Sequence, residues 1–143
     1  MGVSIIGLPS YHDGEEGAKR GKNTIYVFEM DDMRVCHLGD LGHALSESLI
    51  EEIGDIDILM VPTGGEYTID SETAAKVVQD IEPSIIIPMH FASARLNPEV
   101  FSKLEPVDNF VKALGLPSES LPKLSVKKED LGEEQKVVIL VAK

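Results

Sequence analysis

From residue 46 onward, compact apolar runs alternate with amphipathic helices, and this order restricts the folds open to the chain. Residues 56–61 and 84–88 are apolar on both faces and have the length of strands. Between them, behind a helix cap at Asp70 or Ser71, apolar residues recur at helical spacing, namely Ala74, Val77, Val78 and Ile81. Strands buried on both faces and joined through a helix form right-handed crossovers with parallel pairing. The sequence therefore predicts an α/β layer.

The first third of the chain is rich in strand-like runs. Residues 24–30 and 33–38 are joined by Asp31-Asp32, which suits an antiparallel hairpin, and residues 3–8 form a further run. Residues 13–17 contain two glycines and predict a flexible loop that could close over a site as a lid. A helix is then expected between a cap at Ser46 and Gly54.

The last third of the chain contains two further helix patterns. Asn97-Pro98 predicts the start of a short helix, and a second helix is expected to end at Gly115. Residues 117–122 are typical of a turn-rich connector, and residues 135–141 predict a final strand at an edge of the sheet or capping it. Beyond about residue 95 the sequence contains no motif with an obvious chemical role.

Composition limits the class of partner. The 143 residues suit one domain, and the net charge of −12 opposes binding to nucleic acid or to an anionic membrane surface. No apolar run approaches the roughly 20 residues of a membrane-spanning helix, and the N-terminus does not resemble a signal peptide. The single Cys36 is expected to be a buried strand residue. We therefore expect a cytoplasmic protein that acts on a small molecule.

Three potential metal ligands follow separate strand-like runs. His12 comes after residues 3–8, Asp40 after residues 33–38 and His90 after residues 84–88. Because α/β folds gather the ends of such strands at one edge of the sheet, these side chains should converge there. Imidazole and carboxylate groups suit Zn²⁺ and other first-row divalent metals. Each residue taken singly could instead be structural, and a small α/β protein in which the three are coincidental stays open.

The order of the strand-end motifs resembles that of the metallo-β-lactamase superfamily. The motifs are Ser10-Tyr11-His12-Asp13, His37-Leu38-Gly39-Asp40-Leu41-Gly42-His43, Pro62-Thr63-Gly64-Gly65 and Pro88-Met89-His90. They are most similar to its small metal-dependent hydrolases, a branch near the ascorbate-phosphate lactonases. The resemblance implies a two-metal site in which His12 binds the first metal, Asp40 bridges both and acts in catalysis, and His90 binds the second. His43 is a further candidate ligand or a contact of Asp40, whereas His37 is expected to be a strand residue.

The chain departs from the family pattern in one respect. Family members carry an H-x-H-x-D-H motif in an N-terminal half, and this sequence contains none. The resemblance therefore implies half of an αββα sandwich over residues 1–143, with a mixed sheet and helices on one face. Three ligands could hold one metal weakly, so we expect little or no hydrolase activity from the chain alone.

Two functions follow from these patterns. The first is metal-dependent hydrolysis of an ester, lactone or phosphoester, and the alternative is a non-catalytic interaction or regulatory remnant of the same fold. Apolar residues on both faces of the expected sheet, including Tyr26, Phe28, Ile58 and Met60, would leave one face uncovered. We therefore expect a homodimer or a complex with a separate N-terminal half. A C-terminal segment from Asn97 onward that folds back over that face would contradict this expectation.

Overall fold

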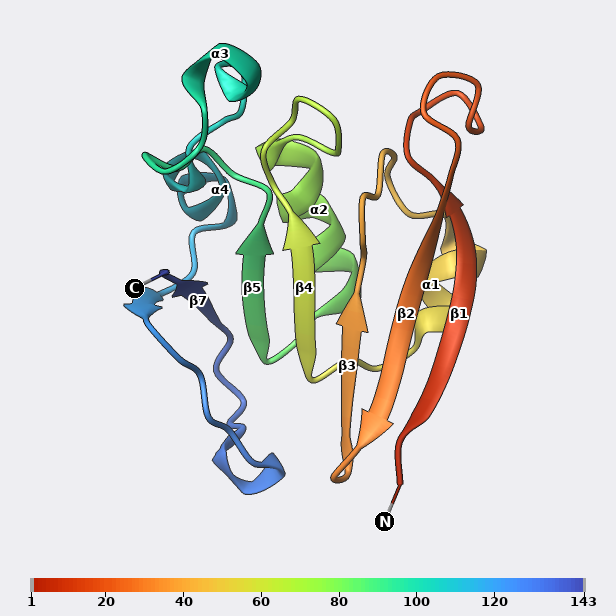
Figure 1. Cartoon of the computed structure of the whole chain (residues 1–143). Coiled ribbons are helices and arrows are strands. Elements are labelled where there is room, and N and C mark those ends of the chain that lie inside the picture. The colour runs from red at the N-terminus through yellow and green to blue at the C-terminus, as the bar shows by residue number, and fades with distance from the viewer. Residues whose placement is uncertain (1, 143) are drawn as a thin grey trace.

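The computed structural model describes residues 2–142, whose strands form one seven-stranded mixed sheet with helices on one face (Figure 1). The strands are β1 (Ser4–Tyr11), β2 (Lys22–Met30), β3 (Met33–His37), β4 (Ile58–Pro62), β5 (Ile85–Met89), β6 (Ser118–Leu121) and β7 (Lys136–Leu140). The helices are α1 (Glu47–Ile53), α2 (Ser71–Ile81), α3 (Pro98–Phe101) and α4 (Val107–Leu114), with a 3-10 turn η1 (Lys128–Asp130). The predicted α/β class is confirmed.

The sheet order is β1-β2-β3-β4-β5-β7-β6. β1, β2 and β3 pair antiparallel, and β3, β4, β5, β7 and β6 pair parallel. The prediction of an edge strand at residues 135–141 is wrong, because β7 lies between β5 and β6. The edge is instead β6, which forms within the predicted connector. The sequence of β6 is mostly polar and so does not look like a buried strand, because an edge strand need not be apolar.

Local signals account for the element boundaries. The Ser46 hydroxyl accepts a hydrogen bond from Leu49 N–H at 3.2 Å, and the Asp70 carboxylate accepts one from Thr73 N–H at 2.8 Å. Asp70 rather than Ser71 therefore caps α2. Asp31 and Asp32 have φ values of 50° and 62°, as a two-residue hairpin turn requires. These residues fix the ends of the predicted elements.

The sheet has two unlike faces. On one face α1, α2 and α4 cover the main core, as seen behind the sheet in Figure 1. This core is formed mainly by aliphatic residues, including Ile25, Val27, Cys36, Leu59, Val77, Val78, Ile86, Phe110 and Val137. On the other face Met33, Ile58, Ile85, Ile87 and Val138 are buried partly under Leu124, Val126 and Leu131. The C-terminal segment therefore covers part of the helix-free face.

One buried position agrees with a sequence prediction. Cys36 is buried in β3, as expected, and burial raises the pKa of its thiol to about 12. No helix within residues 2–142 combines the length and the apolar character that a membrane crossing needs.

Candidate metal centre

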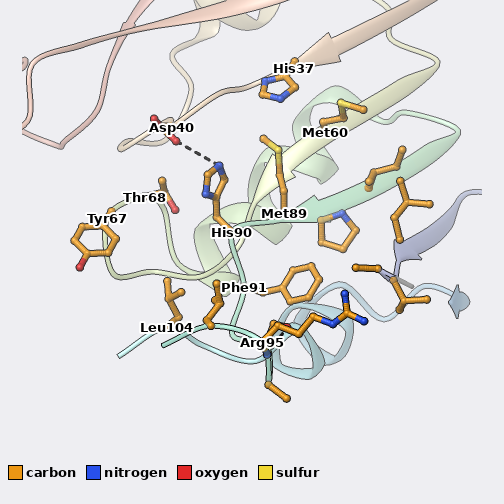
Figure 2. Close-up of a pocket in the computed structure, with 18 of the residues that line it drawn as sticks. His37, Asp40, Met60, Tyr67, Thr68, Met89, His90, Phe91, Arg95 and Leu104 are labelled. Carbon is orange, nitrogen blue, oxygen red and sulfur yellow. Dashed lines mark hydrogen bonds and ion pairs between the residues drawn. The ribbon is translucent and has the colours of Figure 1, made fainter. Parts of the chain in front are cut away.

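The three candidate ligands lie at the side of the sheet where β1, β3 and β5 end. His12 directly follows β1, Asp40 follows β3 after a short turn, and His90 directly follows β5. The Nε2 atom of His90 is 3.3 Å from Oδ1 of Asp40 (Figure 2). Nε2 of His12 is 3.9 Å from Oδ2 of the same carboxylate. The two imidazoles thus approach different oxygens of one carboxylate. The predicted convergence is confirmed, whereas the ligand roles stay predictions.

Asn23 fixes the backbone that carries Asp40. Its Oδ1 accepts a hydrogen bond from Asp40 N–H at 2.9 Å, and its Nδ2 donates to the Leu38 carbonyl and the Ser10 hydroxyl, each at 2.9 Å. The amide of Asn23 in β2 therefore joins the end of β1 to the loop after β3. The sequence alone does not single out Asn23, because its contacts depend on the pairing between strands.

The backbone at His90 is held in an uncommon conformation. His90 has a φ of 56°, in the left-handed region that side chains other than glycine seldom adopt. Nearby, a Cβ on Gly64 would collide with the His90 carbonyl oxygen. Because Gly64 has no side chain, its loop can pass directly against His90. Non-glycine residues with such dihedrals are found preferentially at functional sites.

Asp13 organises the loop that follows His12. Its Oδ1 accepts hydrogen bonds from Glu15 and Gly17 N–H, and its Oδ2 accepts from Lys19 and Arg20 N–H, at 2.7–2.9 Å. These bonds, with that from Arg20 foremost, hold the pKa of Asp13 well below its usual range. Hydrogen bonds to Asp13 therefore hold the backbone of the loop in one conformation. This order does not fit the predicted flexible lid.

The same loop packs against the turn after Asp40. A Cβ on Gly42 would collide with the backbone of His12 and Asp13. Gly42 N–H also donates to the Tyr11 carbonyl at 3.0 Å. The absence of a side chain at Gly42 therefore lets the His12 and Asp40 loops lie in direct contact.

The two other histidines have different surroundings. His43 Nε2 accepts from Tyr11 N–H at 3.1 Å, and its Nδ1 lies 2.8 Å from the Ala44 carbonyl, to which it can donate. Both ring nitrogens of His43 are thus engaged by backbone groups, and the predicted ligand role finds no support in this geometry. His37 Nδ1 accepts from Gly39 N–H at 3.0 Å. Burial, followed by repulsion from His90, lowers the pKa of His37.

A cavity of about 990 Å³ opens beside the candidate ligands. His12, His37, Asp40 and His90 line one part of it, so His37 is a wall residue as well as a strand residue. Most of the remaining wall is apolar and comes from β4, β5, the loop after β5 and the C-terminal residues (Figure 2). Thr68 also lines the cavity, and its Oγ1 is the one buried side-chain oxygen or nitrogen within residues 2–142 that has no hydrogen-bond partner.

The donor chemistry of the trio fits a divalent cation, but the trio does not make a complete site. Two imidazoles and a carboxylate are typical ligands of Zn²⁺ and similar ions. Among the residues that the structure describes, however, no group of three or more His, Cys, Asp or Glu side chains is arranged to hold a metal ion. Metal binding would therefore need additional ligands or movement of these side chains.

Comparison with known proteins shows the family of the chain. A family model described as "Beta-lactamase superfamily domain" matches residues 1–90, which include all three candidate ligands. A "UPF0173 metal-dependent hydrolase" of Thermococcus onnurineus is 33% identical over 108 residues, covering 72% of this chain and 48% of that protein. One from Staphylothermus marinus is 39% identical over 99 residues, covering 67% of this chain and 42% of that protein. The chain thus spans about half the length of the curated relatives that it matches.

A solved structure shares the fold over almost the whole chain. It is a Thermotoga maritima protein assigned as a candidate Zn-dependent hydrolase of the metallo-β-lactamase superfamily. The two superpose with a TM-score of 0.80 at 38% identity, covering 96% of this chain and 65% of that one.

Proposed function

Because the chain belongs to the metallo-β-lactamase superfamily, we propose that it forms the part of a metal-dependent hydrolase that contributes His12, Asp40 and His90 to the metal site. The observation that carries this proposal is the approach of two imidazoles to opposite oxygens of Asp40 beside a large cavity. The relatives named metal-dependent hydrolases support the reaction class. An ester, lactone or phosphoester is the proposed substrate.

The residues of the chain have distinct tasks in this proposal. A divalent metal would supply a hydroxide nucleophile by lowering the pKa of bound water, and would polarise the scissile group. His12, Asp40 and His90 would bind the metal, and Asn23 would hold the backbone of Asp40 in place. The apolar cavity wall would exclude bulk water from the bound substrate. Gly64 would let the following loop approach His90 closely.

We further propose that the site is completed by ligands outside these 143 residues. The trio falls short of a closed ligand set, and the sequence contains no H-x-H-x-D-H. The additional ligands would come from a separate segment or chain packed against the helix-free face. On this proposal the reaction takes place in the cytoplasm, and the protein alone turns over substrate slowly or not at all.

Metal titration tests the ligand roles directly. We expect the 143-residue protein to bind Zn²⁺ weakly in calorimetry, and we expect His12→Ala, Asp40→Ala and His90→Ala each to weaken this binding by about tenfold or more. His43→Ala is the matched control, because both nitrogens of His43 are engaged by the backbone. Equal Zn²⁺ binding by wild type and all three variants would mean that the three residues are not ligands.

Hydrolysis assays then distinguish the two candidate functions. Activity on generic ester and phosphodiester substrates is measured for the protein alone and after co-expression with the part of the Thermotoga maritima protein that this chain does not cover. Chelator-sensitive turnover that appears only in the mixture and is lost in Asp40→Ala supports the hydrolase. Zn²⁺ binding without turnover in a purified, stable complex would favour the non-catalytic remnant. Robust turnover by the chain alone would contradict the need for outside ligands.

A further inference from the structure

The cavity beside the candidate metal centre contains one cationic side chain. Asp40 and the three histidines lie in one part of the cavity, and Arg95 reaches it from the loop after β5, on the far side of Phe91 (Figure 2). Arg95 is the single lysine or arginine among the described residues that line this cavity. The chain has a net charge of −12, so an anion needs such a local cation to bind here.

Nothing in the described part of the chain neutralises Arg95. Its guanidinium has no hydrogen bond or ion pair with the described residues. By contrast, four lysines and Arg34 each form an ion pair with an aspartate or glutamate. The backbone that carries Arg95 is tied down, because Arg95 N–H donates to the Ser93 hydroxyl and Ala92 N–H donates to the Glu105 carbonyl. An anchored loop thus presents an unpaired cation to the cavity.

The wall between the histidine end and Arg95 is apolar. It is formed chiefly by Met60, Ile87, Met89, Phe91, Leu104 and Leu140. Of these, Leu140 has 39% of its surface exposed. Such a wall favours an apolar ligand body, whereas the guanidinium favours a carboxylate or phosphate, to which it can donate two parallel hydrogen bonds.

We propose that the cavity selects an amphipathic anion, with its carboxylate or phosphate on Arg95 and its apolar body along the wall toward Asp40. This inference rests on the proposed function, because it takes the cavity to be the substrate site of the hydrolase. Arg95 is then a specificity-determining residue that acts on the substrate at a distance from the reacting bond. The substrate would be a small ester, lactone or phosphoester that also carries a separate anionic group.

Ligand binding without metal tests this proposal. Octanoate, octyl phosphate and the neutral octanamide are titrated into the 143-residue protein, and backbone amide shifts of Ser93, Ala94, Leu96 and Leu140 are followed by NMR. We expect both anions to bind more tightly than octanamide. A preference between the two anions identifies the head group. Arg95→Ala should weaken anion binding by about tenfold, as expected for loss of a charge-assisted hydrogen bond, and should leave octanamide unchanged.

Two further variants separate charge from position. Lys123→Ala removes the same charge from an exposed residue that does not line the cavity, and should leave all three affinities unchanged. Leu140→Ser should weaken all three ligands, because it removes apolar wall. Equal binding of octanoate by wild type and Arg95→Ala, or tighter binding of octanamide than of the anions, would overturn the proposal. Arg95-dependent binding with no turnover in the completed complex would support this inference and contradict the proposed hydrolase function.

Discussion

Asn23 shows how one neutral side chain can position the loop that carries a candidate metal ligand. Its amide pairs with Asp40 N–H, the Leu38 carbonyl and the Ser10 hydroxyl, so it joins three separate segments. We expect Asn23→Ala to lower the free energy of unfolding by about 1–3 kcal/mol, because partly buried backbone groups lose their partners. Chemical denaturation measures this change. Thr24→Ala, at the next and exposed position of β2, is the control and should stay within about 0.5 kcal/mol of wild type. An Asn23→Ala variant that is as stable as the control would contradict the positioning role of Asn23.

At the scale of elements, Asp13 determines the form of the loop from residue 14 to residue 20. Four backbone N–H groups bind its two oxygens, which lowers its pKa in the folded state. In the unfolded chain an aspartate carboxyl titrates at about pH 4. Below that pH the folded protein therefore binds fewer protons at Asp13 than the unfolded chain does. The stabilisation is therefore complete above that pH and is lost as the pH falls toward the folded pKa.

Asp13→Asn should lower the thermal midpoint at pH 7, because the side-chain N–H₂ would face the Lys19 and Arg20 donors instead of an acceptor oxygen. The difference from wild type should shrink as the pH falls below about 4, where wild-type Asp13 begins to lose its stabilising charge. Thermal unfolding monitored by circular dichroism at several pH values measures both effects. Glu16→Gln alters an exposed acid of the same loop and is the control. A difference in midpoint that does not vary with pH would contradict this role.

At the scale of the whole molecule, the helix-free face of the sheet is only partly covered. The register places Ile5, Phe28, Val35, Ile58 and Ile85 in one row across β1 to β5. Ile85 has 3% of its surface exposed and Ile58 has 6%, but Ile5 has 60% exposed. The C-terminal segment thus covers the row at β4 and β5 and leaves it open at β1. This partial cover counts against the predicted assembly at β4 and β5, whereas at β1 the assembly stays a prediction.

We propose that a second copy of the chain or a separate N-terminal half covers the open side. The protein should sediment as a dimer at micromolar concentration, or form a stable complex with the part of its Thermotoga maritima relative that this chain does not cover. A double variant, Ile5→Glu with Tyr26→Glu, should abolish either assembly because both substitutions place charge on that face. Val100→Glu, on the exposed surface of α3, is the control. A wild-type monomer that also fails to bind the uncovered part of that relative would contradict the assembly.

The sequence by itself determined most of the elements, though not β6, and the location of the candidate site. Periodic apolar residues, the caps at Ser46 and Asp70 and the Asp31-Asp32 turn are local signals, so β2 to β5 and α2 could be predicted. The convergence of His12, Asp40 and His90 was also predictable, because strands that run in the same direction end at the same edge of a sheet. The sequence motifs further indicated the family that the comparisons show.

Tertiary structure alone decided the remaining features, because each depends on residues far apart in the chain. The insertion of β7 between β5 and β6 follows from long-range pairing that no local pattern encodes. The contact of Asn23 with Asp40 requires the register of β2 and β3, and the engagement of His43 requires the end of β1 beside its loop. Arg95 lies in a part of the sequence without a recognisable motif. It becomes a candidate ligand-binding residue only because the fold places it at the same cavity as Asp40. A local pattern records which residues are apolar or polar, whereas packing decides which of them meet.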